Sequence, residues 1–363
     1  MLLYSDLLIM IFEYLREDPG SLCRLCLTCR HVHSVVIDVL YQRVVLHRAR
    51  AIEIFCTTIL EGRASLRPIP WSLWVGPAQY GRHPEIVYLV SRLRRTLNLL
   101  PKLQVLTFTA TAKSFGNVYS GLLECPFKLR TLAAPYHTNL SLVQFLQSQP
   151  SIETLRLHDL DTEPPRALSI VEHIKYISVQ GDFLPRLEVL SADPKVLSTL
   201  LAGRPISHVE ISIGSWLSGE PEALRNLVEA LAQTSVPLVS LKHNLRNIRI
   251  HLWGTKFLNQ IKTTRIKSTL SSLHVALPVI MRPVLERASS AVGPMGAHIS
   301  RTFGSQLDGF TSLSNFELSL DGITFSDSSL EEITAVFGDM SELGTWRSYC
   351  ETLERVTLYG VTL

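Results

Sequence analysis

Apolar residues recur along much of the chain in one fixed order: an apolar residue, two others, an apolar residue, one other and a final apolar residue. The copies begin at Leu103, Leu129, Ile152, Ile174, Leu187, Ile206, Leu245, Leu270, Leu313 and Leu353. Successive side chains of a strand point to opposite faces, so the fourth and sixth residues of a copy share one face. The third, fifth and seventh share the other face and are mostly polar. The pattern predicts short strands, each with one buried and one solvent-exposed face.

Helical spacing of apolar residues appears between several of these strands. The expected helices cover residues 84–99, 193–203, 220–234 and 326–337. Asp193 and Pro194 show the signal clearly, because Asp is a favoured N-cap and Pro is favoured in the first helical turn. Strands that alternate with helices in this way predict an α/β fold.

A strand and a helix repeated every 20–29 residues are typical of leucine-rich repeats, which stack into a curved solenoid. Here the copies begin 13 to 43 residues apart, and the Asn that usually follows the strand is absent. We therefore expect an irregular leucine-rich-repeat solenoid, or horseshoe, over residues 48–363. The alternative is a two-layer α/β domain with a conventional parallel sheet.

The first 47 residues have a different pattern. Residues 6–15 are apolar nearly all round a helix, with a stripe formed by Leu7, Leu8, Ile11, Phe12 and Leu15. Residues 17–20, Glu-Asp-Pro-Gly, end this helix, and Ser21 is expected to cap the next. One or two further helices over 22–40 and a short strand at 44–46 complete the segment. Such a small unit cannot bury its apolar surface alone, so we expect it to need a neighbour.

These residues resemble the F-box, the helical module that binds the Skp subunit of Skp–cullin–F-box ubiquitin ligases. The resemblance lies in Leu3-Tyr4-Ser5-Asp6, Leu7-Leu8 and Ile11-Phe12-Glu13-Tyr14-Leu15, and then in Leu27-Thr28-Cys29-Arg30-His31-Val32. Tyr4 stands where the family usually has Pro, and Val32 where it has Trp. The resemblance implies an F-box-like module at residues 1–47. It also implies Skp contacts by Leu3, Leu7, Leu8, Ile11, Phe12 and Leu15.

The two parts together resemble F-box/leucine-rich-repeat proteins, especially the divergent ones of mushroom-forming fungi. The resemblance implies a substrate adaptor for ubiquitin-dependent degradation, which holds an unknown protein substrate on the repeats. The substrate-binding residues expected on the concave strand face are Arg156, His158, Glu210, Arg249, His251, Glu317, Arg355 and Tyr359. Arg156, Arg249 and Tyr359 are the preferred anchors, because Arg and Tyr are enriched in binding hot spots. The alternatives are an interaction scaffold without a ubiquitin role and, less favoured, an enzyme on an α/β domain.

Composition excludes several other classes of protein. The chain is 46% hydrophobic, so it can bury a large core. Its net charge of +3 argues against nucleic-acid binding through bulk basicity. The longest uncharged run, residues 131–152, is too polar to span a membrane, and the first residues lack the basic region of a signal peptide. We therefore expect a protein of the cytoplasm, the nucleus or both, with no nucleic-acid or membrane partner.

Residues that could carry chemistry do not form a known catalytic motif. Cys23, Cys26 and Cys29 have the spacing of metal ligands but lack a suitable second ligand pair, so we expect them to act as small hydrophobic residues of a helix. The arginines at 92, 94 and 95 are expected on a solvated helix face. The tryptophans at 71, 74 and 253 are expected to cover the core, with ligand stacking as the alternative. The sequence thus predicts no enzyme, no cofactor and no metal.

Overall fold

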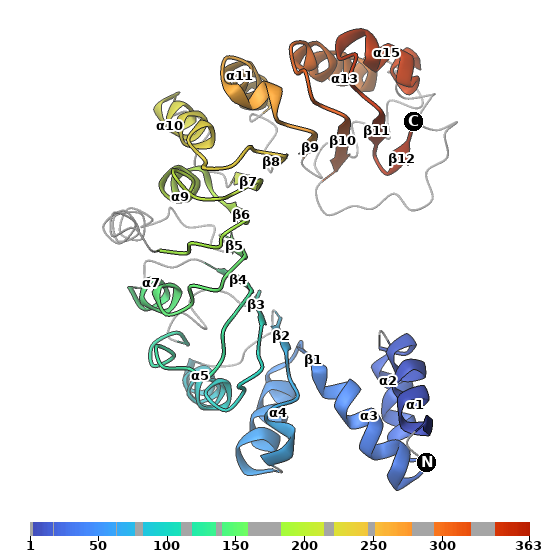
Figure 1. Cartoon of the computed structure of the whole chain (residues 1–363), viewed down its shortest axis with the longest axis vertical. Helices are drawn as coiled ribbons and strands as arrows, with labels where there is room; N and C mark the ends of the chain where they lie inside the picture. The colour runs from blue at the N-terminus through green and yellow to red at the C-terminus, as the bar shows by residue number, and fades with distance from the viewer. Residues whose placement is uncertain are drawn as a thin grey trace. The chain divides into compact units, whose positions relative to one another are not determined.

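The computed structural model describes residues 3–16, 18–62, 64–76, 83–109, 118–135, 140–158, 183–213, 221–245, 251–277, 294–320 and 338–363 (Figure 1). The chain divides into two compact units. The first consists mainly of Met1–Leu155 and the second mainly of Pro185–Leu363, and the boundary falls between Leu155 and Arg156.

The first unit begins with three helices, α1 (Leu3–Tyr14), α2 (Pro19–Cys26) and α3 (Arg30–Gln42). Their shared core contains Phe12, Leu22, Val36 and Val39. Asp18, and not Ser21, is the N-cap of α2, since its carboxylate oxygen Oδ1 accepts a hydrogen bond of 3.1 Å from the Ser21 backbone nitrogen. The expected cap was wrong because Pro19 suits the first helical position, where no backbone N–H is required.

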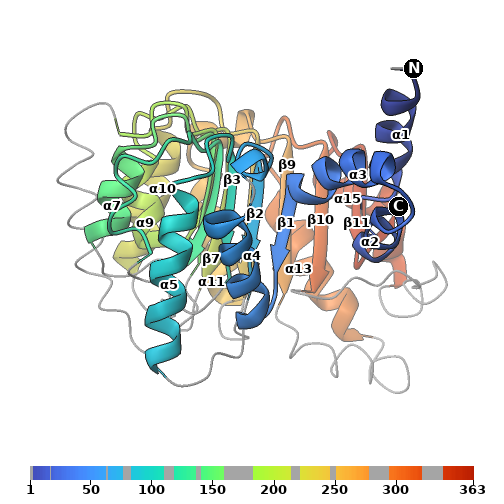
Figure 2. The same cartoon turned by 90° about the horizontal axis from the view of Figure 1, so that it is seen from below.

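Helix α3 runs directly into a sheet of parallel strands (Figure 2). In the first unit the strands are β1 (Arg43–Leu46), β2 (Ser72–Val75), β3 (Val105–Phe108) and β4 (Thr131–Pro135), paired in chain order. The helices are α4 (Ala49–Glu61), α5 (His83–Leu97) and α7 (Leu140–Gln147), with the 3-10 helix η1 (Ala64–Leu66). Figure 1 shows α4, α5 and α7 along one side of these strands. Strand β5 (Thr154–His158) spans the boundary of the units.

The second unit repeats the same plan. Its parallel strands are β6 (Val189–Ala192), β7 (His208–Ile213), β8 (Ser240–Leu245), β9 (Ser272–Leu277), β10 (Asn315–Leu320) and β11 (Arg355–Leu358), followed by antiparallel β12 (Val361–Thr362). The helices are α9 (Pro194–Leu200), α10 (Pro221–Ala232), α11 (His251–Ile261), α13 (Pro294–Leu307) and α15 (Leu343–Tyr349), with 3-10 helices η3 (Arg265–Ser268) and η5 (Gly338–Ser341). The five α-helices lie along one side of the strands (Figure 1).

Alternate strand residues form the core between strands and helices. In β10, Phe316 and Leu318 are buried, and the Phe316 ring lies 5.1 Å from the ring of Trp346 in α15. The intervening residues Asn315, Glu317 and Ser319 remain exposed or half-buried. One face of each described strand therefore builds the core, and the other is mostly accessible.

The structure confirms an α/β fold of parallel strands, and eight of the ten predicted strings contain a strand. The string at Ile174 lies outside the described residues, as does the helix expected at 326–337. The string that begins at Leu245 lies outside the described residues except for Leu245 itself, which is the last residue of β8, a strand that was not predicted. Strand β2 was not predicted. The expected domain boundary at residue 47 stays a prediction.

Candidate protein-binding surfaces

One face of α1 is apolar and accessible. It consists of Leu7, Met10, Ile11 and Tyr14, which recur at the spacing of a single helix face, and we call it the α1 face. Met10 is 60% exposed and Ile11 is 53% exposed. Large apolar side chains gathered on one helix face are typical of a surface that a partner covers.

The opposite side of α1 anchors the module. Phe12 is only 2% exposed, and Leu8 and Leu15 pack half-buried against the same core. Of the residues expected to contact Skp, Leu7 and Ile11 are therefore exposed, whereas Phe12 is buried in the core of the module. Leu3 belongs to α1, but its side chain lies outside the described residues.

Met10 and Tyr14 were not among the residues expected to contact Skp. The predicted stripe combined residues from both sides of an all-round apolar helix. The helical spacing of positions 7, 10, 11 and 14 would have separated the α1 face from the side of the helix that carries Leu8, Phe12 and Leu15.

A second surface is a row of polar side chains on the accessible face of the second unit, which we call the polar row. Its members are register partners across successive strands: Ser191, which is buried, and the half-buried Glu210, Lys242, His274, Glu317 and Thr357. The Lys242 amine nitrogen Nζ lies 3.3 Å from Glu210 Oε1. The polar row therefore contains one pair of opposite charges, Glu210 and Lys242, beside the neutral or titratable side chains of its other strands.

Glu210 is the best-connected member of the polar row. Burial alone would raise the pKa of its carboxyl group, but the charge of Lys242 and the hydrogen bond from Asn244 outweigh burial and hold the pKa below its usual range. Arg156 adds to this lowering of the pKa. The structure thus places Arg156 and Glu210, two of the predicted substrate-binding residues, close enough to interact.

His274 connects two further side chains. Its Nε2 lies 2.6 Å from Ser319 Oγ and 3.5 Å from Glu317 Oε1. A catalytic triad instead requires the acid at the other ring nitrogen, so that it orients the imidazole toward the hydroxyl group. Here Glu317 and Ser319 both approach the same ring nitrogen, Nε2.

The predicted substrate-binding residues separate into three groups. Glu210 and Glu317 lie in the polar row, and Arg156, His158 and Arg355 lie on the strands as expected. Two expectations are wrong. His251 begins helix α11 and does not lie on a strand, and Tyr359 is buried after β11 with a φ of 51°. Arg249 lies outside the described residues.

Four residues of this region were missing from the predicted set: Lys242, Asn244, His274 and Ser319. Lys242 and Asn244 were overlooked because the strand was expected a few residues later. His274 and Ser319 were already expected on the polar face, and their pairing follows from the register of β9 and β10.

The cysteine run does not occupy one helix. Cys23 and Cys26 belong to α2, whereas the Cys29 sulfur accepts a hydrogen bond of 3.5 Å from the Val32 backbone nitrogen as N-cap of α3. Burial raises the pKa of the Cys26 thiol, with a smaller contribution from Cys23. Within the described ranges, no group of three His, Cys, Asp or Glu side chains could hold a metal ion.

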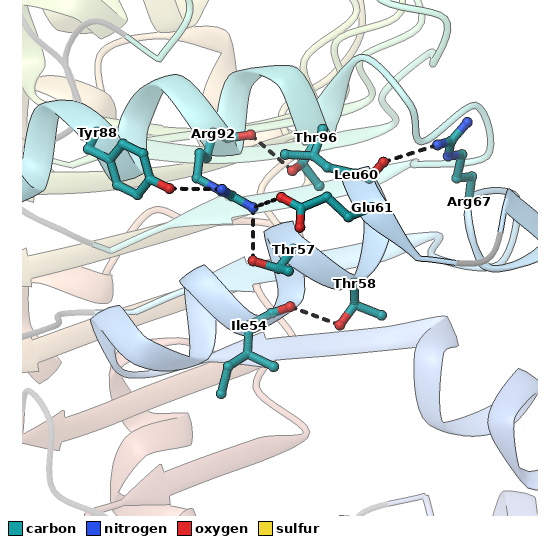
Figure 3. Close-up of polar contacts among 9 residues, drawn as sticks. All are labelled: Ile54, Thr57, Thr58, Leu60, Glu61, Arg67, Tyr88, Arg92 and Thr96. Atoms are coloured by element: carbon teal, nitrogen blue, oxygen red, sulfur yellow. Dashed lines mark hydrogen bonds and ion pairs between the residues drawn. The ribbon is translucent and has the colours of Figure 1, made fainter.

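Arg92 joins two helices and does not lie on a solvated face as expected (Figure 3). One guanidinium nitrogen donates hydrogen bonds of 2.8 Å to Thr57 and Glu61 of α4, and another donates one of 2.8 Å to Tyr88 of α5. The hydrogen bonds with Glu61 and Tyr88 raise the pKa of Arg92. Arg92 therefore fixes α4 against α5.

Comparison with known proteins identifies one family within the chain. Residues 5–47 match the family described as F-box-like. No curated protein matches the sequence. Among the described helices, none has the length and apolar character needed to cross a membrane.

Proposed function

Starting from the F-box-like domain at residues 5–47, we propose that the chain is the substrate-recognition adaptor of a Skp–cullin–F-box ubiquitin ligase. The observation that carries the proposal is the α1 face, because its exposed apolar residues lie on the module that matches the family. In this role the Skp subunit covers the α1 face, and burial of these side chains provides the main favourable free energy of binding.

The remainder of the chain is proposed to be an irregular leucine-rich-repeat array that holds the substrate. The strand order within each unit supports the repeat array. Strands that follow one another in the sequence are also parallel neighbours in the sheet. Doubly wound α/β domains instead reverse their strand order and carry helices on both faces. The helices along one side of the strands in Figure 1 also favour the repeat array.

The polar row is the proposed site for a protein substrate. It combines Glu210, Lys242, His274 and Glu317, so it offers both donors and acceptors and suits a protein better than a polyanionic nucleic acid. Arg156 and Arg355 lie on the strands beside it and extend the same kind of surface.

In this proposal the chain performs no bond chemistry itself. It contributes proximity, because it holds the substrate near the catalytic subunits of the ligase. The proposed products are ubiquitinated proteins destined for degradation in the cytoplasm, the nucleus or both. The likeness to divergent fungal F-box proteins belongs to the same proposal.

An interaction scaffold without a ubiquitin role is the second candidate. Val32, which stands where the family has Trp, packs half-buried against the module core. Because Val is smaller than Trp, the surface near α3 differs from the one that the family presents. A loss of Skp binding through this difference would favour the scaffold.

Reconstitution separates the two candidates. The full chain is mixed with a purified Skp subunit and the amino-terminal part of a cullin, and the mixture is fractionated by size. The adaptor predicts a peak that contains all three proteins. Elution of a well-folded chain by itself, at concentrations where a known F-box protein co-elutes, would favour the scaffold.

A further inference from the structure

The accessible strand face of the first unit has a different chemistry from the polar row. Val45, Trp74 and Thr107 are register partners across β1, β2 and β3, and Ala133, which is buried, continues the row on β4. We call these four residues the Trp74 row. Val45 is 54% exposed. Trp74 is half-buried, whereas Leu73 and Val75 on either side of it in β2 are buried in the core. Trp74 therefore lies on the accessible face and not in the core.

Two contacts hold the Trp74 ring in place. A Cβ atom on Gly76 would lie 2.1 Å from ring atoms Cη2 and Cζ3, so the ring rests directly over the glycine backbone. The His47 ring meets it edge-on, with 4.6 Å between the centroids and an angle of 61° between the planes. A ring restrained in this way loses little conformational entropy when a partner binds.

The charge around the Trp74 row is positive. Arg43 is exposed at the start of β1, and His47 and Arg48 are exposed just after that strand. No Asp or Glu occurs at the face positions of β1 to β4, all of which are described. A cationic ligand over Trp74 would be repelled by these arginines, whereas an acidic partner would be attracted.

We propose that the Trp74 row binds an extended acidic segment of a partner protein, which places one apolar side chain on the Trp74 ring. The half-buried Trp74 ring and the exposed Val45 supply the apolar contact, and Arg43 and Arg48 select acidic neighbours in the partner. This site rests on the proposed array but is separate from both the polar row and the α1 face, because it lies on the first-unit strands and does not involve Skp.

The test uses the full chain and a panel of fluorescein-labelled heptapeptides. One set has Asp and Glu on both sides of a central Leu, Ile, Met, Phe or Pro. A second set has Ser at the centre, and a third has Lys in place of the acids. Fluorescence anisotropy is expected to show binding to the first set and at least tenfold weaker binding to the other two.

Three variants locate the binding. Trp74→Ala removes the ring, Gly76→Ala displaces it without removing it, and Val45→Asp adds a repulsive charge at an exposed position. Each is expected to weaken binding at least tenfold, whereas Val239→Asp, at an exposed valine of the second unit, leaves it unchanged. Failure of the whole first set to bind, tighter binding of the Lys set, or unchanged binding by folded Val45→Asp protein would overturn the proposal.

Discussion

The side-chain nitrogen of Asn244 donates a hydrogen bond of 2.7 Å to Glu210 Oε1 on the neighbouring strand. The two residues are not direct register partners; Asn244 lies opposite Ser212, two residues beyond Glu210. The same carboxylate oxygen also meets Lys242. Glu210 is thereby held by two side chains of β8, so the polar row is pre-organised before any partner arrives.

Glu210 is expected to make the protein sensitive to acid. Its pKa is lower in the folded chain than in the unfolded chain, so its stabilising contribution is present above about pH 4.5 and is lost as the pH falls through the lower, folded value. Glu210→Gln is expected to flatten the decline of the melting temperature as the pH falls below about 4.5. Thermal melts across this range measure the effect, and Glu229→Gln on α10 serves as the control. An identical acid decline in wild type and Glu210→Gln would contradict the pairing.

His243 is expected to make the stability of the protein depend on pH over a higher range than Glu210 does. It is buried on the core face of β8 with its ring 5.4 Å from that of Phe257, and burial lowers its pKa to about 3. The unfolded chain binds a proton near pH 6.5 and the folded chain does not, so stability is full above that value and falls as the pH decreases toward 3. The loss is on the order of a few kcal/mol.

His243→Leu is expected to remove this decline between pH 6.5 and pH 4, as measured by urea unfolding at a series of pH values. His208→Leu, at an exposed position of β7, is the matched control and should retain it. A decline that persists in folded His243→Leu protein would show that other groups cause it.

Arg92→Ala is expected to lower the melting temperature by a few degrees, because it leaves Glu61, Thr57 and Tyr88 without their shared donor. Arg92→Lys should recover only part of the loss, since one ammonium group cannot reproduce the planar fork. Arg95→Ala, at an exposed position of the same helix, is the control and should melt like wild type. Equal melting temperatures for all four proteins would contradict the proposed link between α4 and α5.

Phe12→Ala is expected to unfold the three-helix module. Removing a buried Phe costs about 3–5 kcal/mol, which is large for a core built from so few residues. Hydrogen exchange of α1 to α3 should become fast while exchange in β6 to β11 stays slow. Unchanged protection of α1 would show that the module core does not depend on Phe12.

The sequence predicted most strands because their apolar positions alternate, and it failed where one position was occupied by an unusual residue. Strand β8 was missed because His243 occupies a core position where the pattern requires an apolar residue. Tyr359 was assigned to the accessible face by alternation. However, it follows β11 in a turn with positive φ at both Tyr359 and Gly360, so the alternation no longer holds there.

The candidate surfaces were predictable only in part. The resemblance to the F-box found the module, but an all-round apolar helix does not reveal which side faces its own core. The packing of Phe12 against Leu22 and Val36 settles that question. The pairing of Glu210 with Lys242 and Asn244 depends on strand register, which the sequence did not give for β8.

The affinity of a purified Skp subunit for the full chain tests the central proposal most directly. It is measured by titration calorimetry for wild type, Ile11→Asp on the α1 face, and Ile54→Asp, a matched change at an exposed isoleucine of α4. The account predicts tight binding by wild type and Ile54→Asp and at least a hundredfold weaker binding by Ile11→Asp, because the new charge would be buried without a partner. Equal affinity of all three folded proteins for Skp, or no binding by wild type, would contradict it.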